Sequence, residues 1–167
     1  LFGNCLNIKG CMALSTLLSC TMLKSLDLSN NKIDDEGIDA LVPAFKTSRF
    51  ISDLVINNNQ SITTKGWQHL ASILEAPSNL GKLYCALNNV DDEAVTAFTH
   101  ALNGNRTLSG IYLFNSITLT RGSHVYHAFW KLLCDTTSIN ATFLSNHTLQ
   151  VIYTASDERN INGLLTL

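Results

Sequence analysis

Residues 23–33 read LKSLDLSNNKI, and the spacing of the apolar residues and the asparagine in this stretch decides the fold. The frame is LxxLxLxxNxI, in which Leu26 and Leu28 alternate with polar residues as in a short, half-buried strand. The same frame returns at residues 51–59 and 80–90, in part at 108–113, and truncated at 1–6. The last apolar residues of successive strands are 27 to 29 positions apart, and so regular a spacing indicates an internal repeat.

A second pattern follows each strand, with small or apolar residues at every fourth position over about three helical turns. The four sets are Gly10/Leu14/Leu18, Gly37/Leu41/Phe45, Gly66/Leu70/Leu74 and Ala94/Phe98/Leu102. Each unit is therefore expected to run strand, turn, helix and return. Because a single unit cannot enclose its own apolar face, we expect the units to stack and to share one core.

These repeats resemble the long leucine-rich repeats of the ribonuclease-inhibitor type, which also occur in NOD-like receptors and in Ran GTPase-activating protein. The resemblance covers residues 1 to about 133. It implies an α/β leucine-rich repeat solenoid, a horseshoe arc with a parallel β-sheet on the concave face and helices on the convex face. We expect one such domain over residues 1–154, with about five repeats and a degenerate terminal one. The tail at 155–167 is expected to be either mobile or the start of a truncated cap.

An asparagine column occupies the position where each strand turns inward, and it consists of Asn4, Asn31, Asn59 and Asn88. A carboxamide there can pair with backbone groups that no strand satisfies, so we interpret the column as structural. The fifth repeat has Ser116 in this place and about two extra residues in its turn, and an irregular loop is expected at 135–148. Leu1 opens the chain in the middle of a strand frame, which predicts a piece of a longer repeat protein.

Composition limits the classes of function. The chain is 46% hydrophobic and 14% charged, and its net charge of −2 predicts a folded domain without nucleic-acid partners. The uncharged run between Lys9 and Lys24 holds 14 residues, several of them serine or threonine, fewer than the roughly 20 apolar residues of a membrane span, so no membrane insertion is expected. Five cysteines without a CxxC spacing favour reduced thiols and a cytoplasmic protein, whereas four Asn-x-Ser/Thr triplets leave glycosylation open.

Phosphate-binding, metalloprotease and nucleophile-elbow motifs are missing from the sequence, so we expect no enzyme, no cofactor and no metal. His124 and His127 could form a metal cluster with Cys134, but a solvated helix surface is the favoured interpretation because a tetrahedral site needs more ligands. Acidic clusters at 34–36 and 91–93 precede two of the expected helices. They are expected to cap free N–H groups there.

The informative residues are those that project from the expected strands toward the concave face. These candidate binding residues are Asp27, Asp53, Val55, Lys82, Tyr84, Tyr112, Phe114 and Tyr153. Adjacent parallel strands would gather Tyr84, Tyr112 and Phe114 into one exposed aromatic patch of the kind that dominates recognition surfaces. The alternative is that valine and tyrosine merely suit strands and support each other across the ladder.

We therefore predict a non-enzymatic protein–protein interaction module that binds a protein or peptide on its concave face, in an oligomeric state that the sequence leaves open. The alternative is a regulator of a small GTPase, by similarity to Ran GTPase-activating protein. No residue of this chain matches the functional positions of that activator, and the pronounced acidic stretch expected of one is missing.

Overall fold

The structure is a computed structural model, and it describes residues 1–75, 78–114, 116, 124–133, 137–139 and 145–153, with the backbone alone at 124–126 and 153. Helices and strands alternate along the chain. The described helices are α1 (Ile8–Leu18), α2 (Asp35–Thr47), α3 (Thr64–Glu75), α4 (Asp92–Gly104) and α5 (His124–Leu133). The described strands are β1 (Ser25–Asp27), β2 (Asp53–Val55), β3 (Lys82–Tyr84), β4 (Gly110–Tyr112) and β5 (Val151–Tyr153).

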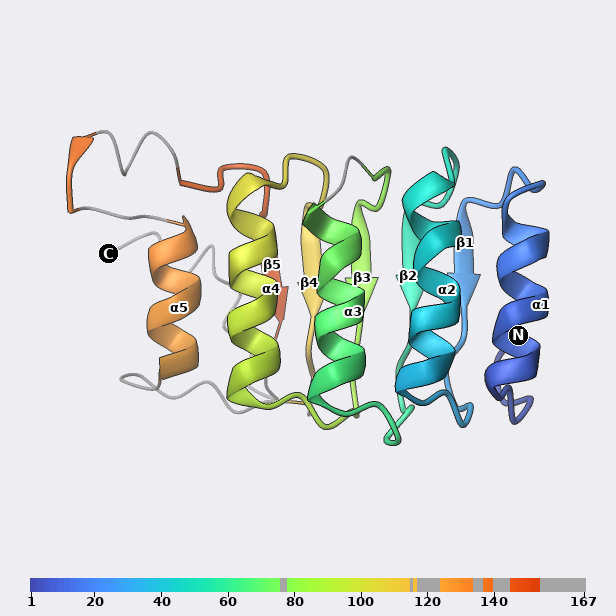
Figure 1. Cartoon of the computed structure of the whole chain (residues 1–167). Coiled ribbons are helices and arrows are strands. Elements are labelled where there is room, and N and C mark those ends of the chain that lie inside the picture. Colours follow the sequence, from blue (N-terminus) through green and yellow to red (C-terminus); the bar gives the residue numbers. More distant parts are fainter. Residues whose placement is uncertain (76–77, 115, 117–123, 134–136, 140–144, 154–167) are drawn as a thin grey trace.

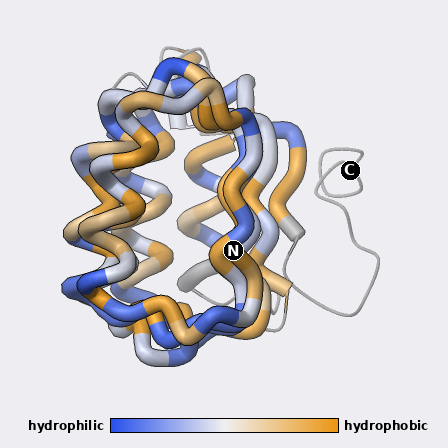
Figure 2. The backbone as a smooth tube through the Cα atoms, turned by 90° about the vertical axis from the view of Figure 1, so that its right-hand side faces the viewer, coloured by the Kyte–Doolittle hydropathy of each residue, from blue (hydrophilic) through white to orange (hydrophobic). Residues whose placement is uncertain are grey.

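The strands form one open parallel sheet in chain order, β1-β2-β3-β4-β5 (Figure 1). Equivalent residues of successive repeats face each other, so that Leu26 pairs with Leu54 and Leu54 pairs with Leu83. The helices stand side by side over one face of the sheet, and the view from the end shows helices and strands as two layers (Figures 1 and 2). The α/β solenoid expected from the repeats is confirmed.

The core lies between these two layers. The middle residue of each strand points toward the helices, and these residues are only 0 to 4% exposed: Leu26, Leu54, Leu83, Ile111 and Ile152. The expected helical stripe meets them from the other side, and its members Leu41, Leu70 and Phe98 are buried. Each buried side chain of this size stabilises the fold by about 1.5–3 kcal/mol. Because each unit packs on its neighbours, one core cluster extends from α1 to β5.

The asparagine column is a set of hydrogen-bonded bridges between repeats. The fully buried side chain of Asn59 donates from Nδ2 to the carbonyl of Leu28 in the preceding repeat at 3.0 Å and to that of Ile56 at 3.2 Å. Its Oδ1 accepts from the backbone N–H of Ile33 at 3.2 Å. Asn31 and Asn88 make equivalent contacts, which confirms the structural interpretation for these three residues.

Ser116 takes over the column in the fifth repeat. Its hydroxyl donates to the carbonyl of Cys85 at 2.6 Å and accepts from the backbone N–H of Asn88 at 3.1 Å. A hydroxyl carries one donor where a carboxamide carries two. The serine therefore preserves the bridge to the preceding repeat with fewer hydrogen bonds.

The first repeat departs from the prediction. Residues 1–7 hold no strand, and the expectation that Leu1 lies within one is wrong. Only a single backbone bond, from Gly3 N–H to the Ser29 carbonyl at 3.0 Å, joins this segment to the next strand end, and a strand needs a continuous ladder. Asn4 also departs from its column: its side chain is exposed and donates to the carbonyl of Phe2. The Leu1 carbonyl, which is equivalent to the Leu28 carbonyl reached by Asn31, accepts from Asn31 instead.

The fifth repeat carries the expected insertion. Helix α5 begins twelve positions after the end of β4, whereas α2, α3 and α4 begin eight or nine positions after their strands. The residues at 117–123, most of the loop at 135–148 and the whole tail at 155–167 lie outside the described residues. Strand β5 follows where the degenerate terminal repeat was expected.

A second column of buried polar residues follows the helices, and the sequence analysis missed it. Asn105 donates from Nδ2 to the Leu74 carbonyl at 2.9 Å, and its Oδ1 accepts from the N–H of Leu108 at 2.7 Å. Asn146 makes the same contacts one repeat later. Three of the four glycosylation triplets thus hold their asparagine Nδ2 in buried hydrogen bonds, at Asn59, Asn105 and Asn146, and a glycan on any of them is incompatible with this fold.

Two helices begin at the acidic clusters as expected. The carboxylate of Asp34 accepts from the N–H of Gly37 at 2.9 Å, and that of Asp91 accepts from the N–H of Ala94 at 2.8 Å. A side-chain acceptor at this position satisfies one of the free donors of the first helical turn. The capping expectation is confirmed for α2 and α4.

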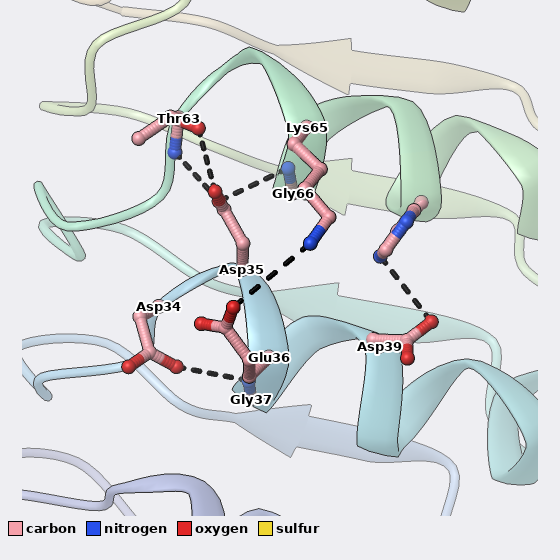
Figure 3. Close-up of polar contacts among 9 residues, drawn as sticks. Asp34, Asp35, Glu36, Gly37, Asp39, Thr63, Lys65 and Gly66 are labelled. Carbon is pink, nitrogen blue, oxygen red and sulfur yellow. Dashed lines mark hydrogen bonds and ion pairs between the residues drawn. The ribbon is translucent and has the colours of Figure 1, made fainter.

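Helix α3 has no acidic residue at the equivalent position and takes its cap from the neighbouring helix (Figure 3). Asp35 of α2 accepts from the N–H of Thr63 at 2.8 Å, from the N–H of Gly66 at 3.0 Å and from the Thr63 hydroxyl at 2.6 Å. A Cβ atom at position 66 would collide with this carboxylate, so glycine permits the approach. Partial burial opposes ionisation of Asp35, but the hydrogen bonds from Thr63 and Gly66 outweigh it and lower the pKa below 3.8.

Candidate protein-binding surface

The sheet surface opposite the helices, here named the open face, is covered by no element of the described part of the chain. The first and third residues of each strand point to this side. The third residues form one row in register, Asp27, Val55, Tyr84, Tyr112 and Tyr153, and the first residues form another, Ser25, Asp53, Lys82, Gly110 and Val151. Seven of the eight candidate binding residues belong to these two rows, Tyr153 through its backbone alone, and Phe114 lies two residues after the end of β4.

Tyr84 and Tyr112 contact each other directly on this face. Their ring centroids are 4.3 Å apart and their planes differ by 9°, so that the rings are stacked. Gly110 makes room for this arrangement, because a Cβ atom there would approach Cε2 of Tyr112 to 3.0 Å. Burial raises the pKa of Tyr84, and the neighbouring Tyr112 and Asp53 and a side-chain hydrogen bond with Tyr112 raise it further, so its hydroxyl stays protonated.

Two carboxylates occupy the β1–β2 side. Asp27 accepts from the backbone N–H of Ser29 at 2.8 Å, and Asp53 accepts from the hydroxyl of Ser52 at 2.5 Å. Both side chains are half-buried, and each carboxylate keeps further acceptor sites for a partner. Lys82 lies next to Asp53 in register and is exposed. This side of the face can accept hydrogen bonds and attract basic groups.

The remaining candidates are placed less closely together. Val55 lies beside Tyr84 in its row, whereas Asp27 is one strand further away. Phe114 is half-buried, and its carbonyl accepts from the N–H of Leu87 at 2.9 Å. The backbone of Tyr153 pairs with Tyr112, but its side chain lies outside the description. Of the predicted exposed patch of Tyr84, Tyr112 and Phe114, the structure brings the two tyrosines into contact and leaves all three side chains half-buried; that Phe114 joins them stays a prediction.

The sequence analysis missed Leu87, which is 46% exposed just beyond β3 and has a left-handed backbone with φ of 59°. The equivalent residues of the other repeats are Gly3, Asn30 and Asn58, all of which share that conformation. Glycine and asparagine adopt it readily, and leucine does not. Alignment of the repeats would have revealed this leucine as the exception.

Other chemistry is sparse in the described part of the chain. An open groove between α3 and α4 is lined mainly by Gln68, Glu75, Glu93 and His100. No three potential metal ligands converge among the described residues, and the cluster imagined around Cys134 falls outside them. Burial raises the pKa of the Cys11 thiol to about 11 and raises that of Cys85 as well, so both stay protonated and unreactive. None of the described helices has the length and apolarity to cross a membrane.

An open parallel sheet with helices on one face, built from units of 27 to 29 residues, defines a solenoid of strand–helix repeats. A family model described as Leucine Rich repeat matches residues 19–42, which span β1 and the beginning of α2. The chain is a leucine-rich repeat protein. Its assignment to the ribonuclease-inhibitor type stays a prediction.

Several longer proteins share this sequence pattern. The chain is 30% identical to protein phosphatase 1 regulatory subunit 37 of Danio rerio over 78 residues, which cover 47% of this chain and 8% of that protein. The protein of the same name from Bos taurus is 27% identical over 114 residues, 68% of this chain and 16% of its own length. NACHT, LRR and PYD domains-containing protein 5 of Homo sapiens is 31% identical over 86 residues, which cover 52% of this chain and 7% of that protein.

The chain therefore spans at most 16% of the length of these relatives. The repeat class indicates a protein-interaction role.

Proposed function

We propose that the open face binds a protein or peptide through the candidate residues Asp27, Asp53, Val55, Lys82, Tyr84, Tyr112, Phe114 and Tyr153. The observation that carries the proposal is the Tyr84–Tyr112 stack on a sheet face that no described element covers. Tyrosine offers a large rigid contact area and a hydroxyl donor, and it is therefore enriched at binding hot spots. The proposed role is recognition without catalysis.

Cross-strand support is the competing explanation, because paired aromatic residues also stabilise a sheet. Two double variants separate the explanations. Tyr84→Phe/Tyr112→Phe keeps the rings and removes both hydroxyls, whereas Tyr84→Ala/Tyr112→Ala removes both aromatic rings. A pair that acts only in the sheet would change stability in the alanine variant and leave binding to the folded protein unaffected.

The test is affinity capture from cell extract with wild type, both tyrosine variants and a control, Gln68→Ala/Thr96→Ala, in the groove on the helical side. Circular dichroism and thermal unfolding first establish that each variant is folded. We expect partners to be lost with the alanine variant, weakened with the phenylalanine variant and kept with the control. Identical captured proteins for all four chains would refute binding on the open face.

Protein phosphatase 1 is the first partner to test directly, because its name is part of the names of several relatives. The proposal also includes a cytoplasmic location, supported by cysteines that are free in the described part of the chain. The net charge of −2 argues against nucleic-acid partners, and the lack of long apolar runs argues against a membrane.

Regulation of a small GTPase is the alternative, and it rests on the resemblance to Ran GTPase-activating protein. The measurement is single-turnover GTP hydrolysis by Ran with and without this chain. Acceleration would favour the alternative, and an unchanged rate over a concentration series would remove it.

A further inference from the structure

In each of the first four repeats the backbone turns through the left-handed region at one fixed position, directly before the asparagine column. Gly3, Asn30, Asn58 and Leu87 hold this position, with φ between 52° and 71°. A side chain branched beyond Cβ gains nothing there to offset the steric clash of Cβ with the backbone, whereas glycine avoids the clash and asparagine tolerates it. Leu87 is thus a residue that the local backbone disfavours.

The backbone around Leu87 gives no reason for a leucine. Its N–H donates to the Phe114 carbonyl at 2.9 Å, and the N–H groups of Asn30 and Asn58 make the same bond to the following repeat. Asparagine adds side-chain bonds at this position, since Asn58 donates to Asn30 and accepts from Gln60. The fold would therefore be served better by asparagine than by leucine.

The surroundings of Leu87 change character at the same repeat. In the row after the strands, Ser29 and Asn57 give way to Ala86 and Phe114, and in the third-residue row Asp27 and Val55 give way to the two tyrosines. The N–H of Cys85 donates to the Tyr112 carbonyl at 2.7 Å, and the N–H of Leu87 continues this ladder to Phe114. Leu87 thus follows the aromatic residues along the same backbone ladder, and its aliphatic side chain is exposed.

Strain is kept at surface positions when something other than the fold requires it. We infer that Leu87 is an affinity-determining contact of the open face, and that the occupant is a peptide segment with an aromatic or aliphatic anchor for Leu87, Tyr84 and Tyr112 and with a lysine or arginine beside it. The basic residue is complementary to the carboxylates of Asp53 and Asp27 in the adjacent strands. This inference rests on the proposed function.

The first part of the test needs no partner. Leu87→Asn and Leu87→Gly should each raise the midpoint of thermal unfolding above that of wild type, because each relieves the disfavoured conformation. The control is Leu17→Asn, which replaces another exposed leucine in α1, away from the sheet, and should not raise the midpoint. A lower midpoint for both Leu87 variants would overturn the inference, because leucine would then serve the fold.

The second part uses a random phage-displayed 12-residue peptide library as the probe. The library is depleted on Tyr84→Ala/Tyr112→Ala and then selected on wild type, and the consensus peptide is synthesised and measured by fluorescence anisotropy. We expect an apolar anchor next to a basic residue in the consensus, at least tenfold weaker binding to Leu87→Asn, and unchanged binding to Leu17→Asn. Binding to Asp53→Asn should weaken by a smaller factor.

The outcomes separate the two proposals. Enriched peptides that require the tyrosines but bind Leu87→Asn as tightly as wild type would overturn the inference and leave the proposed function standing. A consensus without an apolar anchor or a basic residue would overturn the stated chemistry of the occupant. If no peptide is enriched over the depleted variant, both the proposed function and the inference fail.

Discussion

The β1–β2 side and the β3–β4 side of the open face have the same backbone and different chemistry. Both are held by a buried strand centre and by an asparagine that bridges to the preceding repeat. On the first side the outward residues include Asp27, Asp53 and Asn58, and on the second they include Tyr84, Tyr112 and Leu87. The buried columns are therefore constrained by the fold, whereas the outward residues can differ between repeats without disturbing it and can suit a partner.

The largest expected effect follows from breaking the shared frame where the two sides meet. Asn59→Ala removes a fully buried carboxamide, leaves the Ile33 N–H without its acceptor, and takes one of two side-chain donors from each of the Leu28 and Ile56 carbonyls. We expect the free energy of unfolding to fall by about 3 kcal/mol or more, measured by urea denaturation. Ser116→Ala removes two hydrogen bonds and should cost about 1–2 kcal/mol. Equal losses for the two variants would contradict the dominance of the asparagines.

A smaller effect is expected when the leucine of the second side is copied onto the first. Asn58→Leu places leucine in the left-handed conformation and removes the side-chain contacts with Asn30 and Gln60. The free energy of unfolding should fall by about 1–2 kcal/mol in the same assay. Lys32→Leu, at an exposed position of the first of these turns and outside that conformation, is the control for added apolar surface. If Asn58→Leu is neutral, the strain assigned to Leu87 is absent.

The helical layer differs between the two sides as well, because α3 depends on a carboxylate of α2. The folded-state pKa of Asp35 is below the unfolded value of 3.8, so its contribution to stability is present above that value and is lost as the pH falls through the folded pKa. Asp35→Asn should lower the free energy of unfolding by about 1 kcal/mol at neutral pH. The difference from wild type should shrink at acid pH.

The control for this prediction is Glu36→Gln, which affects only an exposed ion pair to Lys65 at 3.9 Å and should change stability very little (Figure 3). Denaturation curves over a pH series measure both variants. A constant difference between Asp35→Asn and wild type down to strongly acid pH would show that the carboxylate charge does not matter.

The smallest effect concerns the border between the two sides. Burial, Tyr112 and Asp53 all raise the pKa of Tyr84, so removing the charge in Asp53→Asn should lower that pKa while burial keeps it above its ordinary value. NMR of ring-labelled tyrosine during a pH titration measures the shift, with Tyr84→Phe assigning the signal. Asp27→Asn, one strand further away, should leave it unchanged. Equal shifts of the Tyr84 pKa in Asp53→Asn and Asp27→Asn would contradict the prediction that Asp53 is the carboxylate that acts on Tyr84.

The repeat spacing predicted the sheet, the helical stripes and the column of Asn31, Asn59 and Asn88, because the same backbone conformation in each of these units requires the same type of residue at these positions. The placement of Tyr84 and Tyr112 on one face also followed from register. The exchange of a cap between Asp35 and α3 could not be predicted, since it depends on the distance between two helices. Leu1 was assigned to a strand because its residue type fits the frame, although strand formation requires a paired neighbour.

The side chains of the asparagine columns, and Ser116 with them, bridge backward along the chain to the preceding repeat. Asn59 binds Leu28, Asn88 binds Ile56, Ser116 binds Cys85 and Asn146 binds Leu102. When a new repeat leaves the ribosome, the carbonyl groups that its bridging side chain contacts have therefore already been synthesised. These bridges can form one repeat at a time from the amino end, before later repeats are made.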